Sequence, residues 1–185
     1  MGKTVRGQWH REILSSPSLS LSPMGGWQRN KGWSHSVTFT RMERNPLQRQ
    51  VAYMRRSLFD QGYLDEQFVQ LEDLQDDANP NFVEEIVTLF YTDSARLIHN
   101  IEQALESRPL DFIRLDDYMH QFKGSSSSIG AKKVKNECTQ FREHCSARSA
   151  EGCVRTFQQV KQEHTILRRK LETYFQLARQ AGLAN

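Results

Sequence analysis

The chain has 185 residues, 37% of them hydrophobic, and a formal net charge of +3. This length suffices for one domain of ordinary size. No segment approaches the ~18 to 20 apolar residues of a membrane span, so we expect a soluble protein with no membrane partner. Residues 1–41 hold six basic residues and one acidic residue (+5), which leaves −2 for residues 42–185. A nucleic-acid-binding domain carries its Lys and Arg on its own surface, so we expect no nucleic-acid partner.

The first 41 residues differ in composition from the rest of the chain. They are rich in Ser, Pro and Gly, hold all three tryptophans, and show no sustained helical or strand period. We therefore predict a disordered Ser/Arg-rich extension at 1–41 and a helical-bundle domain at 42–185. A translation start at Met42, where the composition changes, is an alternative interpretation. An organellar transit peptide is disfavoured, because no clear amphipathic helix accompanies the Arg- and Ser-rich composition.

The remainder of the chain is predicted to be helical, because its apolar residues recur at helical spacing. Two short helices are expected, at residues 47–58 and 64–74, the second marked by the apolar residues Leu64, Phe68, Leu71 and Leu74. A long third helix is expected to open at Asn79, as N-cap, with Pro80 at its first position. It should end at the break formed by residues 107–109.

Three further helices complete the prediction. The fourth is stopped by Gly130, and the fifth carries an apolar stripe of Val134, Cys138, Phe141 and Cys145. The last opens at Ser149 as N-cap, and its apolar stripe runs from Cys153 and Val154 to Leu177. No segment alternates apolar and polar residues long enough to be a strand. We predict an all-α fold, an antiparallel four-helix bundle with two additional short N-terminal helices. The apolar stripe of the fourth helix consists of Leu110, Ile113, Leu115, Met119, Phe122 and Ile129.

The cysteines and two of the six histidines, His99 and His164, are predicted to be structural. Cys138, Cys145 and Cys153 show no Cys-x-x-Cys spacing, which favours reduced, buried thiols. His164 falls within an apolar stripe, so a structural role is favoured for it. No His or Cys pair has a convincing ligand spacing, and we predict neither a metal site nor a cofactor of the chain's own.

Residues 120–128 form the most informative segment, His-Gln-Phe-Lys-Gly followed by four serines. On a helix, Lys123 and Gly124 are the neighbours of His120 on one face. The Lys123 ammonium supplies positive charge for a phosphoryl group on the imidazole. Gly in a helix interior costs about 1 kcal/mol relative to Ala, and Gly124 leaves the imidazole open to a partner. The segment indicates a phosphohistidine carrier; from these residues alone, a histidine at the edge of a bundle core is equally consistent.

The chemistry expected of His120 is nucleophilic. A neutral imidazole nitrogen attacks an acyl-phosphate-like donor, holds the phosphoryl group and yields it to another carboxylate. Neither a Gly-x-x-x-x-Gly-Lys-Ser/Thr loop nor a Gly-x-Gly-x-x-Gly motif occurs, so the chain is predicted to be a carrier without kinase activity, not an enzyme. Asp116 and Asp117 precede His120 by one turn. A solvated helix face is favoured for them over a role in orienting the imidazole.

Residues from about 45 to 181 resemble plant histidine-containing phosphotransfer (HPt) proteins, of the type that relays cytokinin signals. The specific signature is His-Gln-x-Lys-Gly-Ser-Ser-x-Ser, and it is matched in full from His120 to Ser128. The extension at 1–41 has no counterpart in this family. The other matching segments are residues 57–65, 75–80, 120–130, 141–143 and 174–179.

The resemblance implies an HPt-like bundle with His120 exposed near its middle. His120 would accept a phosphoryl group from the receiver aspartate of a hybrid histidine kinase and pass it to a response-regulator receiver aspartate. Lys123 matches the family's phosphoryl contact and Gly124 its point of partner access; Arg142 is a candidate second phosphate contact. Mg²⁺ is expected on the partner receiver domain, and the chain is expected to be monomeric, cytoplasmic and nuclear. Relatives that lack the histidine act as inhibitory pseudo-carriers, a subclass that the retained His120 disfavours.

A small, transient partner interface is expected around His120, formed by Gln121, Gly124 and Ser125 with the short helix at 64–74. Phe68 and Val69 are its candidate apolar contacts, with bundle packing as the alternative for Phe68. Two rival functions are a module that sequesters receiver domains without accepting phosphate, and a kinase or phosphatase, against which the missing nucleotide and metal motifs argue.

Overall fold

The structure, a computed structural model, describes residues 46–76 and 78–183. The predicted extension, residues 1–41, lies outside the described residues. Within them, no helix has both the length and the apolar character needed to cross a membrane. The predicted all-α fold is confirmed, since the only β-type pairings of the described residues are two isolated bridges. The helices are α2 (Pro46–Asp60), α3 (Glu66–Glu72), α4 (Phe82–Glu106), α5 (Phe112–Ser128), α6 (Lys132–Ser146) and α7 (Ala150–Gln180).

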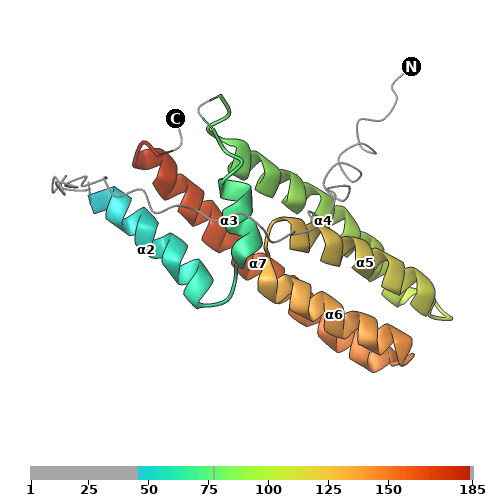
Figure 1. Ribbon diagram of the computed structural model, residues 1–185. Coiled ribbons are helices and arrows are strands. Elements are labelled where there is room, and N and C mark those ends of the chain that lie inside the picture. The colour runs from blue at the N-terminus through green and yellow to red at the C-terminus, as the bar shows by residue number, and fades with distance from the viewer. Residues whose placement is uncertain (1–45, 77, 184–185) are drawn as a thin grey trace, which may run out of the picture. The chain divides into compact units, whose positions relative to one another are not determined.

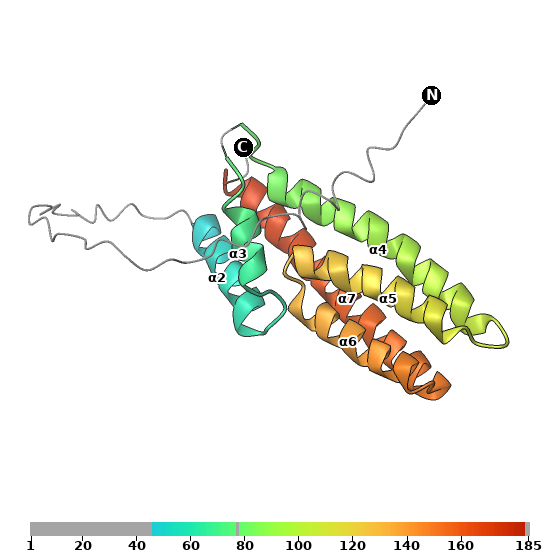
Figure 2. The ribbon, with the colours of Figure 1, turned by 45° about the vertical axis from the view of Figure 1, so that its right-hand side comes forward.

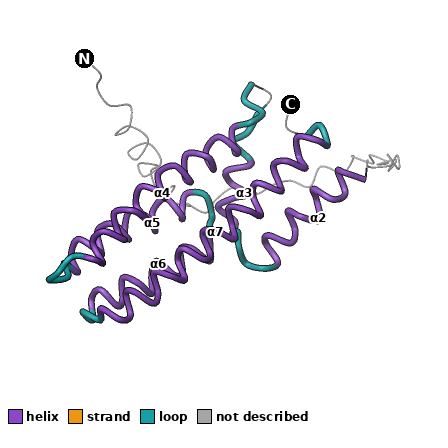
Figure 3. Tube along the Cα trace, turned by 180° about the vertical axis from the view of Figure 1, so that it is seen from behind, coloured by secondary structure: helices purple, strands orange, loops and turns teal. Residues whose placement is uncertain are grey.

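Four long helices, α4 to α7, form the predicted antiparallel bundle (Figure 1). Short turns connect them, so that α5 lies between α4 and α6, and α6 lies against α7 (Figure 2). Helix α2 runs along the C-terminal part of α7, and α3 lies beside the end of α5 (Figure 3). Helices α2 and α3 therefore cover one end of the bundle. Helix α3, with 7 residues, is short as predicted, whereas α2 has 15 residues, as many as α6.

Apolar residues at helical spacing form one large core. Its largest fully buried side chains include Phe68, Phe122, Phe141 and Phe157. A second, small cluster of Val51, Ala178 and Ala181 attaches α2 to α7. The predicted stripe of α6 is confirmed at every position, because Val134, Cys138, Phe141 and Cys145 are all buried.

Three residues that the sequence assigned to apolar stripes are exposed instead. Ile113 is 75% exposed because it lies in the first turn of α5, and the buried stripe of that helix begins at Leu115. Leu74 is 67% exposed because α3 ends before it, at Glu72. Val154 is 47% exposed, since its neighbour Cys153 takes the inward position.

The predicted start of α4 is wrong. The side chain of Asp76 accepts hydrogen bonds from the N–H groups of Ala78 (3.1 Å) and Asn79 (2.9 Å), which makes a turn where the helix was expected. Helix α4 begins at Phe82, and Gln75 Oε1 accepts the N–H of Val83 at 3.3 Å. A side chain from before the turn thus takes over part of the capping that the local sequence assigned to Asn79.

Capping of the other long helices follows the sequence more closely. Ser149 is the N-cap of α7, as predicted, and its Oγ accepts the N–H of Gly152 at 3.2 Å. Asp111 caps α5 by accepting the N–H groups of Ile113 and Arg114, both at 3.1 Å. These caps define where α5 and α7 begin.

Gly130, in the turn between α5 and α6, holds α3 against the bundle. Its φ is +68°, and a Cβ there would lie 2.6 Å from the backbone N of Phe68. The Asp65 N–H donates to the Gly130 carbonyl at 3.0 Å. Any larger residue at 130 would push α3 away, so this glycine is required by the fold.

Candidate functional site

His120 lies on the outer face of α5. Leu115, Met119, Phe122 and Ser126 form the buried face of the helix, so the helical period turns His120 toward solvent. This is the exposed position that the sequence predicted. Among the residues that the structure describes, no side chain forms a hydrogen bond or an ion pair with the imidazole. The imidazole is therefore open to a group brought by another molecule.

Lys123 lies one turn further along α5 and is half-buried. Burial raises the pKa of Cys138, on α6, to about 12, and the charge of Lys123 opposes that increase. The ammonium is thus close to the boundary between α5 and α6. No carboxylate pairs with it within residues 46–76 and 78–183. An unpaired ammonium beside an exposed imidazole can bind a phosphoryl oxygen without first losing another partner.

Gly124 is exposed, and the fold does not require it to be a glycine. A Cβ at this position would meet no atom within 4 Å. Its φ is not in the left-handed region, in contrast to that of Gly130. A mid-helix glycine nevertheless costs about 1 kcal/mol relative to alanine. Since nothing inside the domain accounts for that cost, the missing side chain favours contact with something outside it.

The four serines after Gly124 end the helix as small polar residues. Three of their hydroxyls donate to carbonyls of the preceding turn: Ser125 to Phe122 (3.1 Å), Ser127 to Lys123 (2.9 Å) and Ser128 to Ser125 (2.8 Å). No His, Asp, Glu or Lys side chain of the described residues accepts a hydrogen bond from these hydroxyls, so nothing indicates that one of them is a nucleophile.

Arg142, the candidate second phosphate contact, forms an ion pair with Asp116. Its Nε and Nη2 donate to the two carboxylate oxygens at 2.7 and 3.0 Å, and this hydrogen bonding raises the pKa of Arg142. The interpretation of Asp116 as part of a merely solvated face is therefore wrong, whereas Asp117 is exposed. Sequence reasoning missed the pair because it joins two helices. A phosphate contact by Arg142 stays a prediction.

The expected docking residues separate into two groups. Gln121 is exposed, and Ser125 and Val69 are half-exposed, so they remain candidates for partner contact. Phe68 is 0% exposed and contacts the ring of Phe59 edge-on, with 6.3 Å between the ring centroids. The prediction that Phe68 contacts a partner is wrong, because the ring packs inward beside Gly130.

His164 has the structural role that its apolar surroundings predicted. It is 7% exposed, and its Nε2 lies 2.7 Å from the Oγ of Ser94, which is itself fully buried. The rings of Phe90, Tyr91 and Phe122 surround it. Burial lowers the pKa of His164 to about 4.

The three cysteines are buried and free, as predicted. Cys145 and Cys153 meet across the turn between α6 and α7, with their Sγ atoms 3.7 Å apart. Within the described residues, no cluster of three or more His, Cys, Asp or Glu side chains could hold a metal ion.

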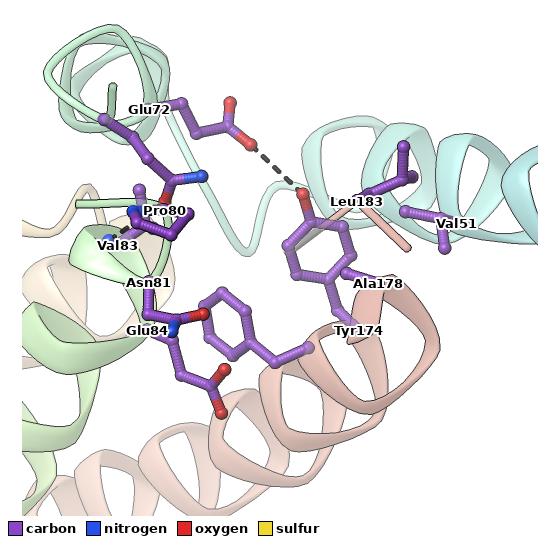
Figure 4. A pocket seen from close by; sticks show the side chains of 11 residues that line it. Val51, Glu72, Pro80, Asn81, Val83, Glu84, Tyr174, Ala178 and Leu183 are labelled. Atoms are coloured by element: carbon purple, nitrogen blue, oxygen red, sulfur yellow. Dashed lines mark hydrogen bonds between the residues drawn. The ribbon is translucent and has the colours of Figure 1, made fainter. Parts of the chain in front are cut away.

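A cavity of about 170 Å³ lies apart from His120, between α2, α3, the start of α4 and the end of α7 (Figure 4). The Tyr174 hydroxyl points across it and donates to Glu72 Oε1 at 3.3 Å. Glu72 is also bound by Arg55, whose Nε lies 3.0 Å from Oε1. No residue of α5 lines this cavity, so it does not extend the His120 site.

Comparison with known proteins relates this geometry to a family. Residues 85–170 match the Hpt domain. Histidine-containing phosphotransfer protein 4 of Arabidopsis thaliana is 72% identical over 116 residues, which cover 63% of this chain and 91% of that protein. Pseudo histidine-containing phosphotransfer protein 5 of Oryza sativa subsp. japonica is 63% identical over 143 residues, 77% of this chain and 94% of that protein.

A solved structure agrees with these relatives. The crystal structure of the histidine-containing phosphotransfer protein MtHPt2 from Medicago truncatula superposes with a TM-score of 0.72 at 45% identity, covering 76% of this chain and 96% of that one. Identities of this size over nearly the whole length of the relatives establish the family. The chain is a member of the plant histidine-containing phosphotransfer proteins, the intermediates of two-component phosphorelays.

Proposed function

We propose that His120 is the phosphoryl acceptor of this relay protein. An imidazole nitrogen attacks the phosphorus of a receiver aspartyl phosphate, the P–N bond forms, and the P–O bond to the aspartate breaks. The aspartate leaves as a carboxylate, and the reverse sequence on a second receiver releases the group. The observation that carries this proposal is an exposed imidazole that, like the neighbouring Lys123, has no side-chain partner among the described residues, next to a glycine that the fold does not need.

The donor is the receiver domain of a hybrid histidine kinase, and the acceptor is the receiver domain of a response regulator. Lys123 contacts the phosphoryl oxygens, and Gly124 with Gln121 and Ser125 admits the partner surface. Phosphoryl transfer depends on positioning and charge, so Mg²⁺ and acidic groups on the receiver can supply the rest of the machinery. The chain then needs no cofactor and no ATP site of its own, and it acts as a monomer in the cytoplasm and nucleus.

The test is transfer of labelled phosphate from a phosphorylated receiver domain to the full-length chain, with wild type beside His120→Gln. Wild type should acquire an acid-labile, alkali-stable label that His120→Gln lacks. His99→Gln, at an exposed histidine of α4, is the matched control and should be labelled like wild type. Incubation with labelled ATP alone should label neither protein, and labelling by ATP would contradict the carrier role.

A second candidate function is a module that sequesters receiver domains without accepting phosphate. The similarity to a rice relative whose name marks it as a pseudo phosphotransfer protein favours this alternative. The same experiment separates the two. Wild type that binds the receiver but stays unlabelled would identify a sequestering module, whereas label on His120 would identify a relay.

A further inference from the structure

The ion pair between Asp116 and Arg142 is placed where it can act on His120. Asp116 precedes His120 by four residues on α5, which brings their Cβ atoms within about 6 Å. Helices α5 and α6 are antiparallel, so the position on α6 level with His120 lies one turn before Arg142, near Cys138. Because helical side chains lean toward the N-terminus of their own helix, Arg142 leaves α6 in the direction of His120.

The charges around the imidazole are arranged asymmetrically. Lys123, on the C-terminal side of His120, is unpaired among the described residues. Arg142, on the N-terminal side, is bound by both oxygens of Asp116, with Asp117 also acting on it. The Asp116 and Arg142 side chains are 30% and 33% exposed, so water and other anions can reach the pair. It can therefore be exchanged for another anion, and guanidinium binds phosphoryl oxygens in the same two-point manner as a carboxylate.

We propose that Asp116 is a positioning residue: it holds the Arg142 guanidinium away from His120 until a phosphoryl group arrives, and Arg142 then exchanges the carboxylate for phosphoryl oxygens. The inference rests on the proposed function of His120, and it adds a residue that regulates how strongly the phosphoryl group is held there. Asp116 competes with the phosphoryl group for Arg142, which weakens the hold on that group. A relay benefits from this competition, because the group must leave again for the second receiver.

The test is a double-mutant cycle on the equilibrium constant for phosphoryl exchange between a receiver domain and the full-length chain. Asp116→Asn should move that equilibrium about fivefold toward phosphohistidine, and Arg142→Gln should move it toward the receiver by a similar factor. In the Arg142→Gln background, Asp116→Asn should have no further effect. Equal effects of Asp116→Asn with and without Arg142 would show that the carboxylate acts only through its own charge, and would overturn the proposal.

The chain offers a matched control pair on two other helices of the bundle. Lys161 of α7 and Glu102 of α4 form a similar inter-helix ion pair at 2.8 Å. Glu102→Gln should leave the exchange equilibrium unchanged. Thermal unfolding of every variant should show that each remains folded under the assay conditions. A shift of the equilibrium in Glu102→Gln equal to that in Asp116→Asn would contradict a role specific to Asp116.

A second measurement does not depend on any receiver. Phosphoramidate, a small donor that phosphorylates histidine directly, should shift the Arg142 Nε–H signal in the NMR spectrum of the wild type. In Asp116→Asn, that signal should already be displaced before phosphorylation. An Arg142 signal that stays unchanged on phosphorylation of His120 would overturn the exchange. If the Arg142 Nε–H signal shifts on phosphorylation but no receiver domain transfers a phosphoryl group to the chain, the result would contradict only the proposed relay function.

Discussion

The outer face of α5 and the interior beneath it each contain a histidine, and the two residues are used in opposite ways. His120 is exposed, without a partner among the described residues, and next to an unpaired ammonium. His164 is 7% exposed, bonded to Ser94 and surrounded by aromatic rings. The same side chain is thus open to a group from outside in one place and part of the core in the other, because its surroundings decide whether a nitrogen is free; the proposed phosphoryl chemistry belongs to the first of these places.

The comparison predicts its largest effect for His120→Gln. Phosphoryl labelling from a receiver should fall at least about 1,000-fold, since glutamine has no nucleophilic ring nitrogen to form the P–N bond at this position. The midpoint of thermal unfolding should stay within a few degrees of wild type, because an exposed side chain without partners contributes little to stability. Parallel labelling and unfolding experiments measure both quantities. A large loss of stability would mean that His120 has a structural role that the fold does not show.

His164→Ala should give the opposite pattern. It leaves the buried hydroxyl of Ser94 without its 2.7 Å partner and opens a cavity among Phe90, Tyr91 and Phe122. We expect a loss of about 3 kcal/mol in the free energy of unfolding. Phosphotransfer per folded molecule should be unchanged. Denaturant unfolding measures the free energy of unfolding. Loss of phosphotransfer in a fully folded His164→Ala variant would contradict the view that the two histidines have separate roles.

The interior histidine should also make the domain sensitive to acid. Burial holds the pKa of His164 at about 4, below its unfolded value near 6.5. The unfolded chain therefore binds more protons in this window, and stability is lost as the pH falls from about 6.5 toward 4. Lowering the pH from 7 to 5 should cost roughly 2 kcal/mol through this group. Denaturant unfolding at several pH values measures the loss, and His164→Ala should show less of it than wild type.

The two glycines beside the site should respond in opposite directions, with the smallest effect at Gly124. Gly124→Ala should raise the free energy of unfolding by about 1 kcal/mol, because a Cβ there meets nothing and alanine favours the helix. Gly130→Ala should destabilise the domain, since its Cβ would lie 2.6 Å from the backbone of Phe68. Unfolding experiments on both variants check this prediction. Destabilisation by Gly124→Ala would mean that the fold does require this glycine.

Larger side chains at position 124 sharpen the same comparison. Gly124→Gln should leave the domain folded while it slows transfer from the receiver, because the added atoms would stand in the partner's path. Transfer at the wild-type rate would contradict the proposed access role.

Local spacing alone was enough to identify the helical bundle and the exposed histidine. The helical period separates the outer residues of α5 from its buried ones, so the neighbourhood of His120, Lys123 and Gly124 follows from their positions in the chain. The buried stripe of α6 and the cap at Ser149 follow from equally local rules. These features depend on residues within one or two turns of each other, which a sequence displays directly.

Only the tertiary structure decided which residues meet across elements. The pairing of Arg142 with Asp116, the 3.7 Å approach of Cys145 to Cys153 and the burial of Phe68 under the turn at Gly130 all depend on how helices are rotated and aligned. Even the start of α4 was set by Asp76 and Gln75, which lie before the helix. The spacing of apolar residues in the sequence shows which face of a helix is buried, but the rotation of that helix against its neighbour depends on the packing of the whole core.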